Sequence, residues 1–317
     1  MSENPVREVA PGVFLLDAHY VRPNLAACYV VKGRDSSAVV ETGHAAAVPR
    51  ILAALDQLGI PRRSVSHVLV THVHLDHAGG AGALMRELPQ ATLIAHPRGA
   101  RHLIDPTKLW AGTVQVYGAE PTKRLYGDPI AVPAERVKEA PDGFSVDLGN
   151  RRLTCLDAPG HAKHHLVVHD EASRGFFTGD CFGLSYRELD SAAGPFFYPT
   201  TTPVQFDPAA LHATIDKILA HQPERVFLTH FGMVAGDLPK HAKTLHAAID
   251  AFVACAEAAP KGEQRHQALK ASLAEDLLAR VAVHAPKLSR DEVLEIFDGD
   301  LDLDAAGLEI WLDSRGH

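Results

Sequence analysis

The segment Thr71-His-Val-His-Leu-Asp-His77 places three histidines and one aspartate within six positions: His72, His74, Asp76 and His77. Histidine and aspartate are ligand types that bind borderline divalent metals. An apolar run at 68–70 precedes the motif and Gly79 follows it, so we expect a tight turn between a buried strand and a helix. Four ligands in one turn are too many for one tetrahedral site with an open position. The motif therefore predicts two adjacent metal ions rather than a solvated histidine-rich loop.

Three further ligand-type residues follow apolar segments that are typical of β-strands: His161, Asp180 and His230. The segments that lead to them are residues 152–156, 176–179 and 226–229. Each residue alone is weak evidence, because a single histidine after a strand is more often structural than a ligand. Together with the first motif, they form a set of seven.

The order of this set resembles the metallo-β-lactamase superfamily and, within it, the glyoxalase II-like hydrolases. The matching segments are Thr71–Gly80, Pro159–His161 with a second histidine at His165, Thr178–Asp180 and Thr229–His230. Val40-Glu-Thr-Gly43 resembles the family's strand-ending Asp-Thr-Gly, but Glu41 replaces the aspartate, so we do not assign Glu41 as a ligand. The resemblance covers residues 10 to 235.

The resemblance implies a ligand set in which His72, His74 and His161 bind one metal, Asp76, His77 and His230 bind the second, and Asp180 bridges both. Asp76 and Asp180 are the candidate catalytic residues, and His165 is a candidate to support a ligand without binding a metal itself. The implied fold is α/β, an αββα sandwich of two mixed β-sheets with helices outside. The expected cofactors are two divalent metal ions, zinc first, with iron and manganese as alternatives.

A pair of such metals lowers the pKa of bound water to about 7 and polarises a carbonyl group. We therefore predict a dinuclear hydrolase that uses a metal-bridging hydroxide on a small ester, thioester or lactone. Thioesters fit the resemblance best, because lactonases of the superfamily usually carry a tyrosine three residues after the bridging aspartate, where this chain has Gly183. The alternatives are a mononuclear iron dioxygenase of the same superfamily, a nuclease and a metal-binding interaction module.

The amino-acid composition of the chain limits the kinds of molecule that it is expected to bind. The chain has 317 residues, 46% of them hydrophobic, which is enough for a large folded core. Its formal net charge of −8 argues against nucleic acid as a partner and disfavours the nuclease. No apolar run approaches a membrane span, and the N-terminal residues do not resemble a secretory signal. Scattered cysteines (Cys28, Cys155, Cys181 and Cys255) favour a reducing, cytoplasmic location. The expected partner is a small-molecule substrate.

Local patterns predict two domains, a catalytic one over residues 1–238 and a helical C-terminal extension over 239–317. We expect strands at 13–16, 28–31, 38–40 and 92–95, helices at 45–58 and 208–221, and a short helix that follows the last of these strands and runs toward Ile104. The extension should contain helices at 240–258, 262–283, 293–297 and 305–312, the third opened by a capping box at Ser289. Its composition is typical of a helical cap or of an element that forms a homodimer.

Two segments lack a regular pattern. Residues 105–143 contain five prolines and several aromatic residues, which indicates an irregular insertion that partly covers the metal site or forms a surface excursion, with room for a helix in it. Residues 183–208 leave from the bridging aspartate, so they are the better candidates for a pocket wall. The candidate pocket residues are Tyr186, Phe196 and Tyr198, with packing on helix 208–221 as the alternative.

Overall fold

Short hydrophobic segments in the first 140 residues form a seven-stranded β-sheet. Its strands, in both chain order and sheet order, are β1 (Arg7–Ala10), β2 (Val13–Asp17), β3 (Ala27–Lys32), β4 (Ser37–Val40), β5 (Val65–Leu69), β6 (Thr92–Ala95) and β7 (Val137–Glu139). Strands β1 to β4 are antiparallel and β4 to β7 are parallel. The four predicted strands in this region are confirmed. The structure is a computed structural model that describes residues 6–201, 204–285 and 287–315.

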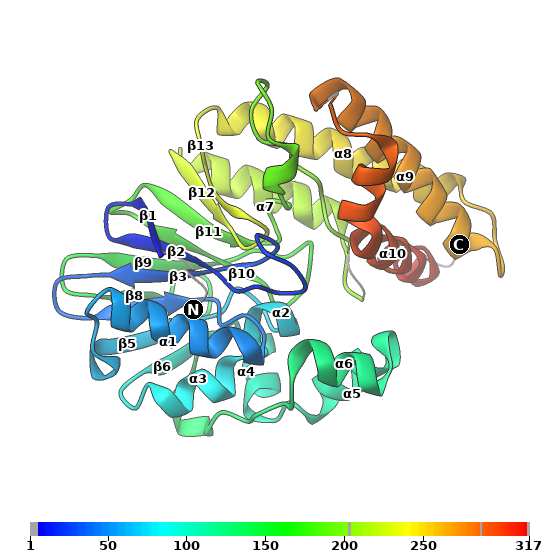
Figure 1. Ribbon diagram of the computed structural model, residues 1–317. Coiled ribbons are helices and arrows are strands. Elements are labelled where there is room, and N and C mark those ends of the chain that lie inside the picture. Colours follow the sequence, from blue (N-terminus) through cyan, green and yellow to red (C-terminus); the bar gives the residue numbers. More distant parts are fainter. Residues whose placement is uncertain (1–5, 202–203, 286, 316–317) are drawn as a thin grey trace. The chain divides into compact units, whose positions relative to one another are not determined.

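A second sheet has six strands in the order β13-β12-β11-β10-β9-β8. Their bounds are β8 (Ser145–Asp147), β9 (Arg152–Asp157), β10 (Leu166–Asp170), β11 (Gly175–Gly179), β12 (Arg225–Leu228) and β13 (Gly232–Ala235). Only the β11–β12 pair is parallel among the neighbouring pairs described. Both sheets are thus mixed, and the predicted architecture of two mixed sheets with flanking helices is confirmed (Figure 1).

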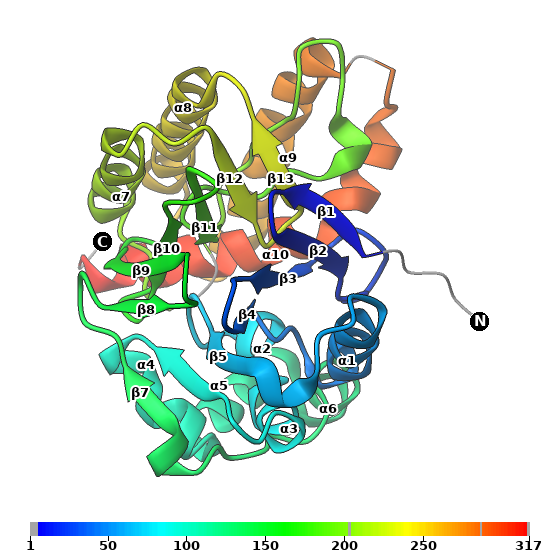
Figure 2. The same cartoon turned by 90° about the vertical axis from the view of Figure 1, so that its left-hand side faces the viewer.

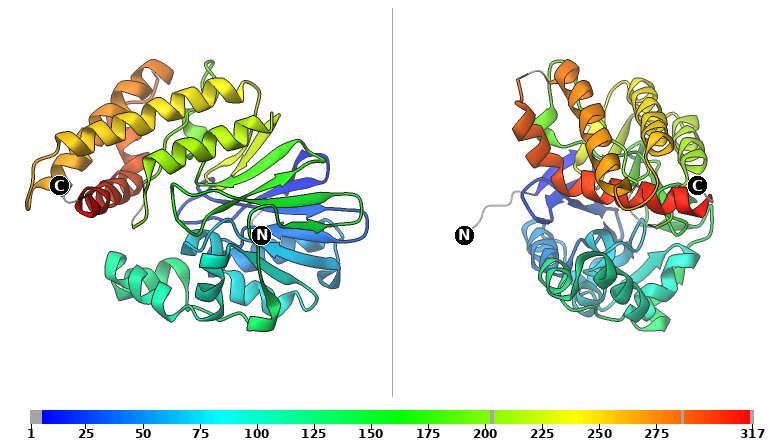
Figure 3. Two further views of the ribbon diagram at one scale, coloured as in Figure 1. Left: turned by 180° about the vertical axis from the view of Figure 1, so that it is seen from behind. Right: turned by 90° about the vertical axis from the view of Figure 1, so that its right-hand side faces the viewer.

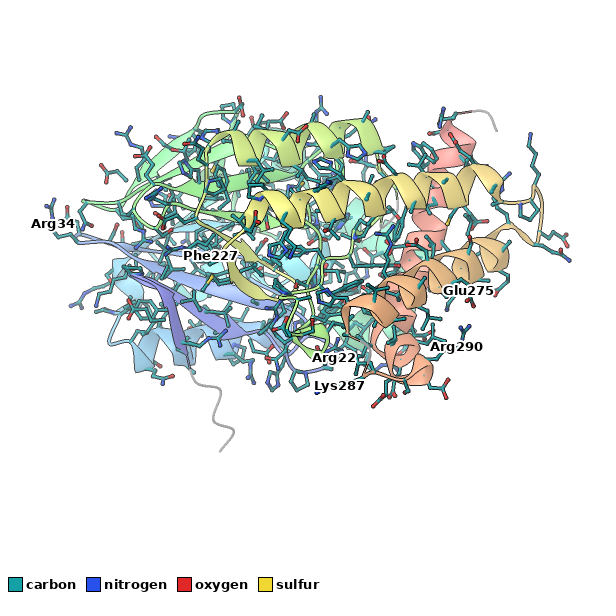
Figure 4. The ribbon with its side chains drawn as sticks, turned by 90° about the horizontal axis from the view of Figure 1, so that it is seen from above. Arg22, Arg34, Phe227, Glu275, Lys287 and Arg290 are labelled. Atoms are coloured by element: carbon teal, nitrogen blue, oxygen red, sulfur yellow. The ribbon has the colours of Figure 1, made fainter. Side chains whose placement is uncertain are left out.

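The two sheets pack face to face through alternate residues of each strand. In β3, Tyr29 and Val31 belong to the core between the sheets, whereas Cys28 and Val30 belong to the core under the helices. The Tyr29 ring meets the Phe177 ring edge-on at 5.2 Å, and Phe177 stacks on Phe227 at 4.6 Å. Figure 4 labels Phe227 among the strands. A strand buried on both faces reads as a continuous apolar run, as β3 does.

Helices cover the outer face of the first sheet (Figure 2). They are α1 (Val48–Gln57), α3 (Ala81–Glu87) and α4 (Pro97–Ile104), and their buried Ile51, Leu84 and Leu103 side chains pack in one cluster with strands β4 to β6. The helix predicted over 45–58 begins as a 3₁₀ turn, η1 (Ala45–Ala47), and ends before Gly59, whose φ of +62° suits glycine.

The prediction that residues 105–143 are mainly irregular was wrong. This segment forms α5 (Thr107–Tyr117), α6 (Ala119–Tyr126), η3 (Ala134–Arg136) and strand β7. Two of the prolines mark the starts of helices, because Pro106 is the N-cap of α5 and Pro121 lies in the first turn of α6. The first turn tolerates proline, since its N–H groups have no partner within the helix.

The chain divides into two compact units that are discontinuous in sequence. Unit 1 comprises Met1–Asp157, His164–Gly179 and Pro223–Ala235 and contains both sheets. Unit 2 comprises Ala158–Lys163, Asp180–Gln222 and Gly236–His317. The single domain boundary after residue 238 stays a prediction, because compactness does not measure independent folding.

Four long helices dominate unit 2: α7 (Pro208–Ala220), α8 (Leu238–Ala258), α9 (Arg265–His284) and α10 (Arg290–Ser314). Figure 3 shows α8 and α9 side by side in yellow and orange. Residues 183–207 contain one short 3₁₀ turn, η4 (Arg187–Leu189), among the described residues, as expected for an irregular segment. Thr202 and Pro203 lie outside the described residues. The remaining short elements, η2 (Arg62–Ser64) and α2 (Leu75–Ala78), belong to unit 1.

The prediction of two short final helices was wrong, because α10 is one helix of 25 residues. The capping box is confirmed, since the Ser289 side chain accepts the Glu292 amide and Glu292 accepts the Ser289 amide. Gly299 costs a helix interior only about 1 kcal/mol, so the apolar face that packs on α9 continues through it. An exposed ion pair of 2.6 Å joins Arg290 to Glu275 of α9 (Figure 4).

None of the helices described is both long and apolar enough to cross a lipid bilayer.

Candidate metal centre

The His-rich motif begins two residues after β5 ends and runs into the short helix α2. His74 is the N-cap of that helix, so the turn directs several side chains to one side. His72 and His77 are buried, with 1% and 0% of their surface exposed. The Nε2 atom of His72 lies 2.8 Å from Nδ1 of His74. Two imidazole nitrogens at this separation suit a common ligand position.

Three of the predicted ligands from unit 1 converge: Asp76, His77 and His230. One ligand atom from each lies within 4.8 Å of the others. The Asp76 carboxylate is 3.3 Å from Nε2 of His230 and 3.6 Å from Nε2 of His77. His230 follows β12, and its Nδ1 lies 2.7 Å from the Leu25 carbonyl oxygen. Because Nδ1 donates to that carbonyl, Nε2 is the nitrogen available to a metal.

Glu41 accepts the hydrogen of His77 Nδ1, as the Leu25 carbonyl oxygen accepts that of His230 Nδ1. Its carboxylate is 1% exposed and lies 3.1 Å from Nδ1 of His77. The hydroxyl groups of Thr71 and Thr229 also donate to this carboxylate, the latter at 3.2 Å. Glu41 therefore fixes the His77 ring with Nε2 toward Asp76. Sequence reasoning assigned Glu41 no role, although its place after an apolar strand was the available signal.

Replacing Glu41 with glutamine should weaken metal binding at the group of Asp76, His77 and His230. The glutamine keeps the size of the side chain but removes the charge that fixes the His77 ring, and loss of such a partner typically costs about 10–100-fold in metal affinity. Equilibrium dialysis against buffered zinc measures the effect. The control is Glu87→Gln, which changes an exposed partner of Arg62. Equal affinity of Glu41→Gln and wild type would contradict the assignment.

His165, the candidate supporting residue, contacts His72 of the motif; its supporting role stays a prediction. It is fully buried, and its ring stacks on that of His72 at 4.7 Å. A Cβ at Gly179 would come within 2.5 Å of Nε2 of His165, so only glycine fits at the end of β11. Sequence reasoning missed His164, whose ring centre lies 5.7 Å from that of His74. Only its position next to His165 could have indicated it.

Unit 2 supplies the remaining two predicted ligands, His161 and Asp180. They lie 3.4 Å apart, His161 Nε2 to Asp180 Oδ2, and both are buried. Gly160 precedes His161 with a φ of +130°, and a Cβ there would lie 2.3 Å from Leu211. The Pro-Gly-His turn thus requires its glycine. Asp180 is bonded directly to Gly179, the last residue of β11, so its backbone is fixed by a sheet strand.

The irregular segment 183–207 is anchored in unit 2 by a buried carboxyl group that sequence reasoning missed. Asp304 of α10 accepts the Thr201 amide at 2.6 Å and the Thr201 hydroxyl at 3.1 Å. The neighbouring Thr200 carbonyl oxygen lies 3.5 Å from Nδ1 of His161. Burial raises the pKa of the Asp304 carboxyl well above 3.8, and the Asp300 charge adds to the rise while the Thr201 hydrogen bonds oppose it. The raised pKa favours the neutral form of the Asp304 carboxyl, which holds the backbone next to His161 through Thr201.

Asp304→Asn should flatten the pH dependence of stability. Because its folded pKa is raised, the carboxyl contributes its full stability below about 3.8, the ordinary value, and loses it as pH rises toward the folded pKa. Asparagine keeps the acceptor for Thr201 and cannot ionise. From pH 4 to 8 we expect the free energy of unfolding, from urea titrations, to fall more for wild type than for the variant. Parallel curves, or an equal change in the exposed Asp298→Asn control, would exclude this account.

The candidate pocket residues are buried in unit 2. Tyr198 is fully buried, and its ring packs on Phe252 and Phe297 at 5.1 and 4.9 Å. The Tyr186 hydroxyl donates to Asp300 at 3.0 Å, and Phe196 lies 5.3 Å from the His284 ring. These contacts are with α8, α9 and α10, whereas the predicted alternative was packing on α7. A pocket role for Tyr186, Phe196 or Tyr198 stays a prediction.

Comparison with known proteins identifies the family of this chain. The family model described as the metallo-beta-lactamase superfamily matches residues 21–230. The metallo-beta-lactamase fold-containing protein ST1585 of Sulfurisphaera tokodaii is 24% identical over 67% of this chain and 75% of its own. Its crystal structure superposes with a TM-score of 0.66, at 20% identity, over 94% of this chain and 98% of the other.

Several relatives carry enzyme names. A bovine protein named acyl-coenzyme A thioesterase MBLAC2 is 27% identical over 55% of this chain and 64% of its own length. A hydroxyacylglutathione hydrolase of Cupriavidus taiwanensis is 30% identical over 61% of this chain and 58% of its own length. This chain thus matches less than two thirds of either enzyme.

Proposed function

Because this chain belongs to the metallo-β-lactamase superfamily, we propose that it is a dinuclear metal-dependent hydrolase that cleaves a small thioester, ester or lactone. The observation that supports this most directly is the convergence of Asp76, His77 and His230 within 4.8 Å. Each of the two histidines has its other ring nitrogen held by an acceptor, Glu41 or the Leu25 carbonyl. This arrangement fixes which nitrogen meets the metal, as in known metal sites.

We propose the following metal ligands among the residues of this chain. In the set that the family resemblance implies, His72, His74 and His161 would hold the first metal, Asp76, His77 and His230 would hold the second, and Asp180 would be shared. The residues fit divalent metals, since the donors are imidazole and carboxylate groups, which suit zinc and also iron or manganese. When bound, such a pair supplies an activated water, with a pKa lowered from 15.7 to about 7, and polarises the substrate carbonyl.

The protein residues orient the reaction. The Asp76 and Asp180 carboxylates can accept hydrogen bonds from the attacking water and so position it. Glu41, through the Thr71 and Thr229 hydroxyl groups, holds the ends of β4, β5 and β12 in one arrangement. His165 packs behind His72 and limits movement of its ring. Cys181 takes no part, because its buried Sγ donates to the Ala158 carbonyl at 3.1 Å.

We propose a thioester as the first substrate class. Two relatives support it, one named an acyl-coenzyme A thioesterase and one a hydroxyacylglutathione hydrolase. A lactone is second. A tyrosine three residues after Asp180 would replace Gly183, where φ is +70° and a Cβ would lie 2.6 Å from the Tyr198 carbonyl oxygen. The four free thiols support a reducing, cytoplasmic location.

The experiment is metal quantification on protein purified without added metal, followed by rates on acyl thioesters, lactones and phosphodiesters. We expect two metals per chain, thioester turnover, and a rate that rises with pH through a group titrating near neutrality. Cys181→Ala should retain both metals and activity. Iron at one equivalent with oxygen uptake would favour a dioxygenase instead, and turnover of phosphodiesters alone would favour a nuclease.

A further inference from the structure

A second cluster of histidine and aspartate side chains lies in unit 2, away from the ligand set in sequence. His212 and Asp216 are one turn apart on α7, and His246 and Asp250 are one turn apart on α8. The two imidazole ring centres are 4.8 Å apart and the ring planes are inclined by 22°. Their Nδ1 atoms are 2.5 Å apart. The same residue pair thus occurs on two packed helices.

Each aspartate contacts the Nε2 atom of the histidine on the other helix. Nε2 of His212 lies 3.1 Å from Asp250, and Nε2 of His246 lies 3.2 Å from Asp216. A carboxylate accepts only, so each Nε2 carries the hydrogen. In the neutral ring, Nδ1 then presents a lone pair. Two lone pairs that face each other repel, unless a cation shared by both nitrogens lies between them.

We propose that this cation is a divalent transition-metal ion, zinc first, bound by Nδ1 of His212 and Nδ1 of His246. Two carboxylates balance the charge of one divalent ion, whereas a shared proton would leave one negative charge in excess. A carboxylate on the far side of a metal-binding imidazole is the usual supporting group in zinc sites. The proposal assigns that role to Asp216 and Asp250.

The geometry allows the ion to enter. Zinc–nitrogen bonds of about 2.0–2.1 Å in a tetrahedron separate two ligand nitrogens by about 3.3 Å, so the rings must move apart by less than one ångström. Their side chains are 28% and 24% exposed, which leaves room for this movement and for water as the remaining ligands. A metal bound at this site would cross-link α7 to α8. It is independent of the ligand set proposed for hydrolysis.

The test counts zinc on the whole protein. Wild type and the His212→Gln/His246→Gln variant are dialysed against increasing free zinc, and bound zinc is measured with the melting temperature. We expect wild type to bind one equivalent more than the variant, however many the catalytic site holds, and a zinc-dependent rise in melting temperature that the variant lacks. Thioester turnover should be equal in both. The matched control is His266→Gln, because His266 of α9 is a single histidine that contacts two carboxylates, Asp302 and Glu309, of the neighbouring helix α10.

A second variant keeps the test decisive if the first misfolds. Asp216→Asn/Asp250→Asn retains both imidazoles and should bind the extra zinc about 10–100-fold more weakly. Equal zinc stoichiometry and affinity in wild type and both variants would overturn the proposal. So would an NMR titration in which the His212–His246 pair takes up one proton and its Nδ1 signals do not respond to zinc.

Discussion

Asp180→Ala should lose at least one of the two proposed metals and nearly all hydrolytic activity. Asp180 is the shared ligand in our assignment, and its carboxylate also lies 3.4 Å from Nε2 of His161. The loss in kcat/KM should exceed the 10–100-fold that removal of a supporting residue typically costs, because a ligand itself is removed. Metal content by elemental analysis and thioester turnover measure the two effects together.

The matched control for this substitution is Asp190→Ala, which removes a carboxylate from the same segment. Asp190 is 45% exposed and pairs with Arg187, outside the ligand set. Its variant should keep both metals and activity. A wild-type protein that saturates with one metal, or an Asp180→Ala variant that keeps two, would refute the dinuclear assignment. Activity lost with both metals retained would instead limit Asp180 to positioning the attacking water.

Asp170→Ala should destabilise the protein by about 3–5 kcal/mol, the usual cost of leaving one buried charge without its partner. Asp170 is fully buried at the end of β10 and binds Arg151, with Nε to Oδ1 at 2.9 Å. Arg151 also donates to the Pro11 carbonyl at 2.7 Å, so the guanidinium cannot easily turn to solvent. Urea titration with a circular-dichroism signal measures the change.

The double variant Arg151→Met/Asp170→Leu distinguishes the cost of an unpaired buried charge from the cost of lost packing. Removing both charges should restore most of the lost stability, since replacing a buried ion pair by apolar residues is often neutral or stabilising. Exchange of the exposed pair, Arg174→Met/Glu224→Leu, should change the free energy of unfolding little. If the buried double variant is as unstable as Asp170→Ala, loss of packing rather than the unpaired charge accounts for the effect.

The strands and the ligand candidates were predictable from sequence for one physical reason. A strand buried on both faces reads as an apolar run, and the residue at its end stands at the sheet edge. His72, Asp180 and His230 each follow such a run. Glu41 follows one as well, but its role depends on a contact with His77 across 36 residues, which no local pattern records.

Other contacts between segments far apart in the chain could not be predicted either, because no local sequence pattern records them. Asp304 holds Thr201 across 103 residues, and His212 meets His246 across 34. The error in secondary structure at 105–143 came from prolines read as signs of an irregular segment. Pro121 stands in a first helical turn, where its missing N–H costs nothing. The helices predicted at 293–297 and 305–312 are parts of one helix, in which Gly299 lies on a chain segment whose apolar face outweighs its low propensity.

The interleaving of the two units sets a limit on how early in synthesis the fold can form. Strand β11 is fully buried, and its parallel partner β12 begins only at Arg225, after the whole of the segment 180–222 has been made. A nascent chain that ends before β12 therefore presents β11 as an open hydrophobic edge, the kind of edge that pairs with other chains. The vulnerable interval on the ribosome lasts from Gly179 until β13 has emerged, and a chaperone that binds apolar strands would act within it.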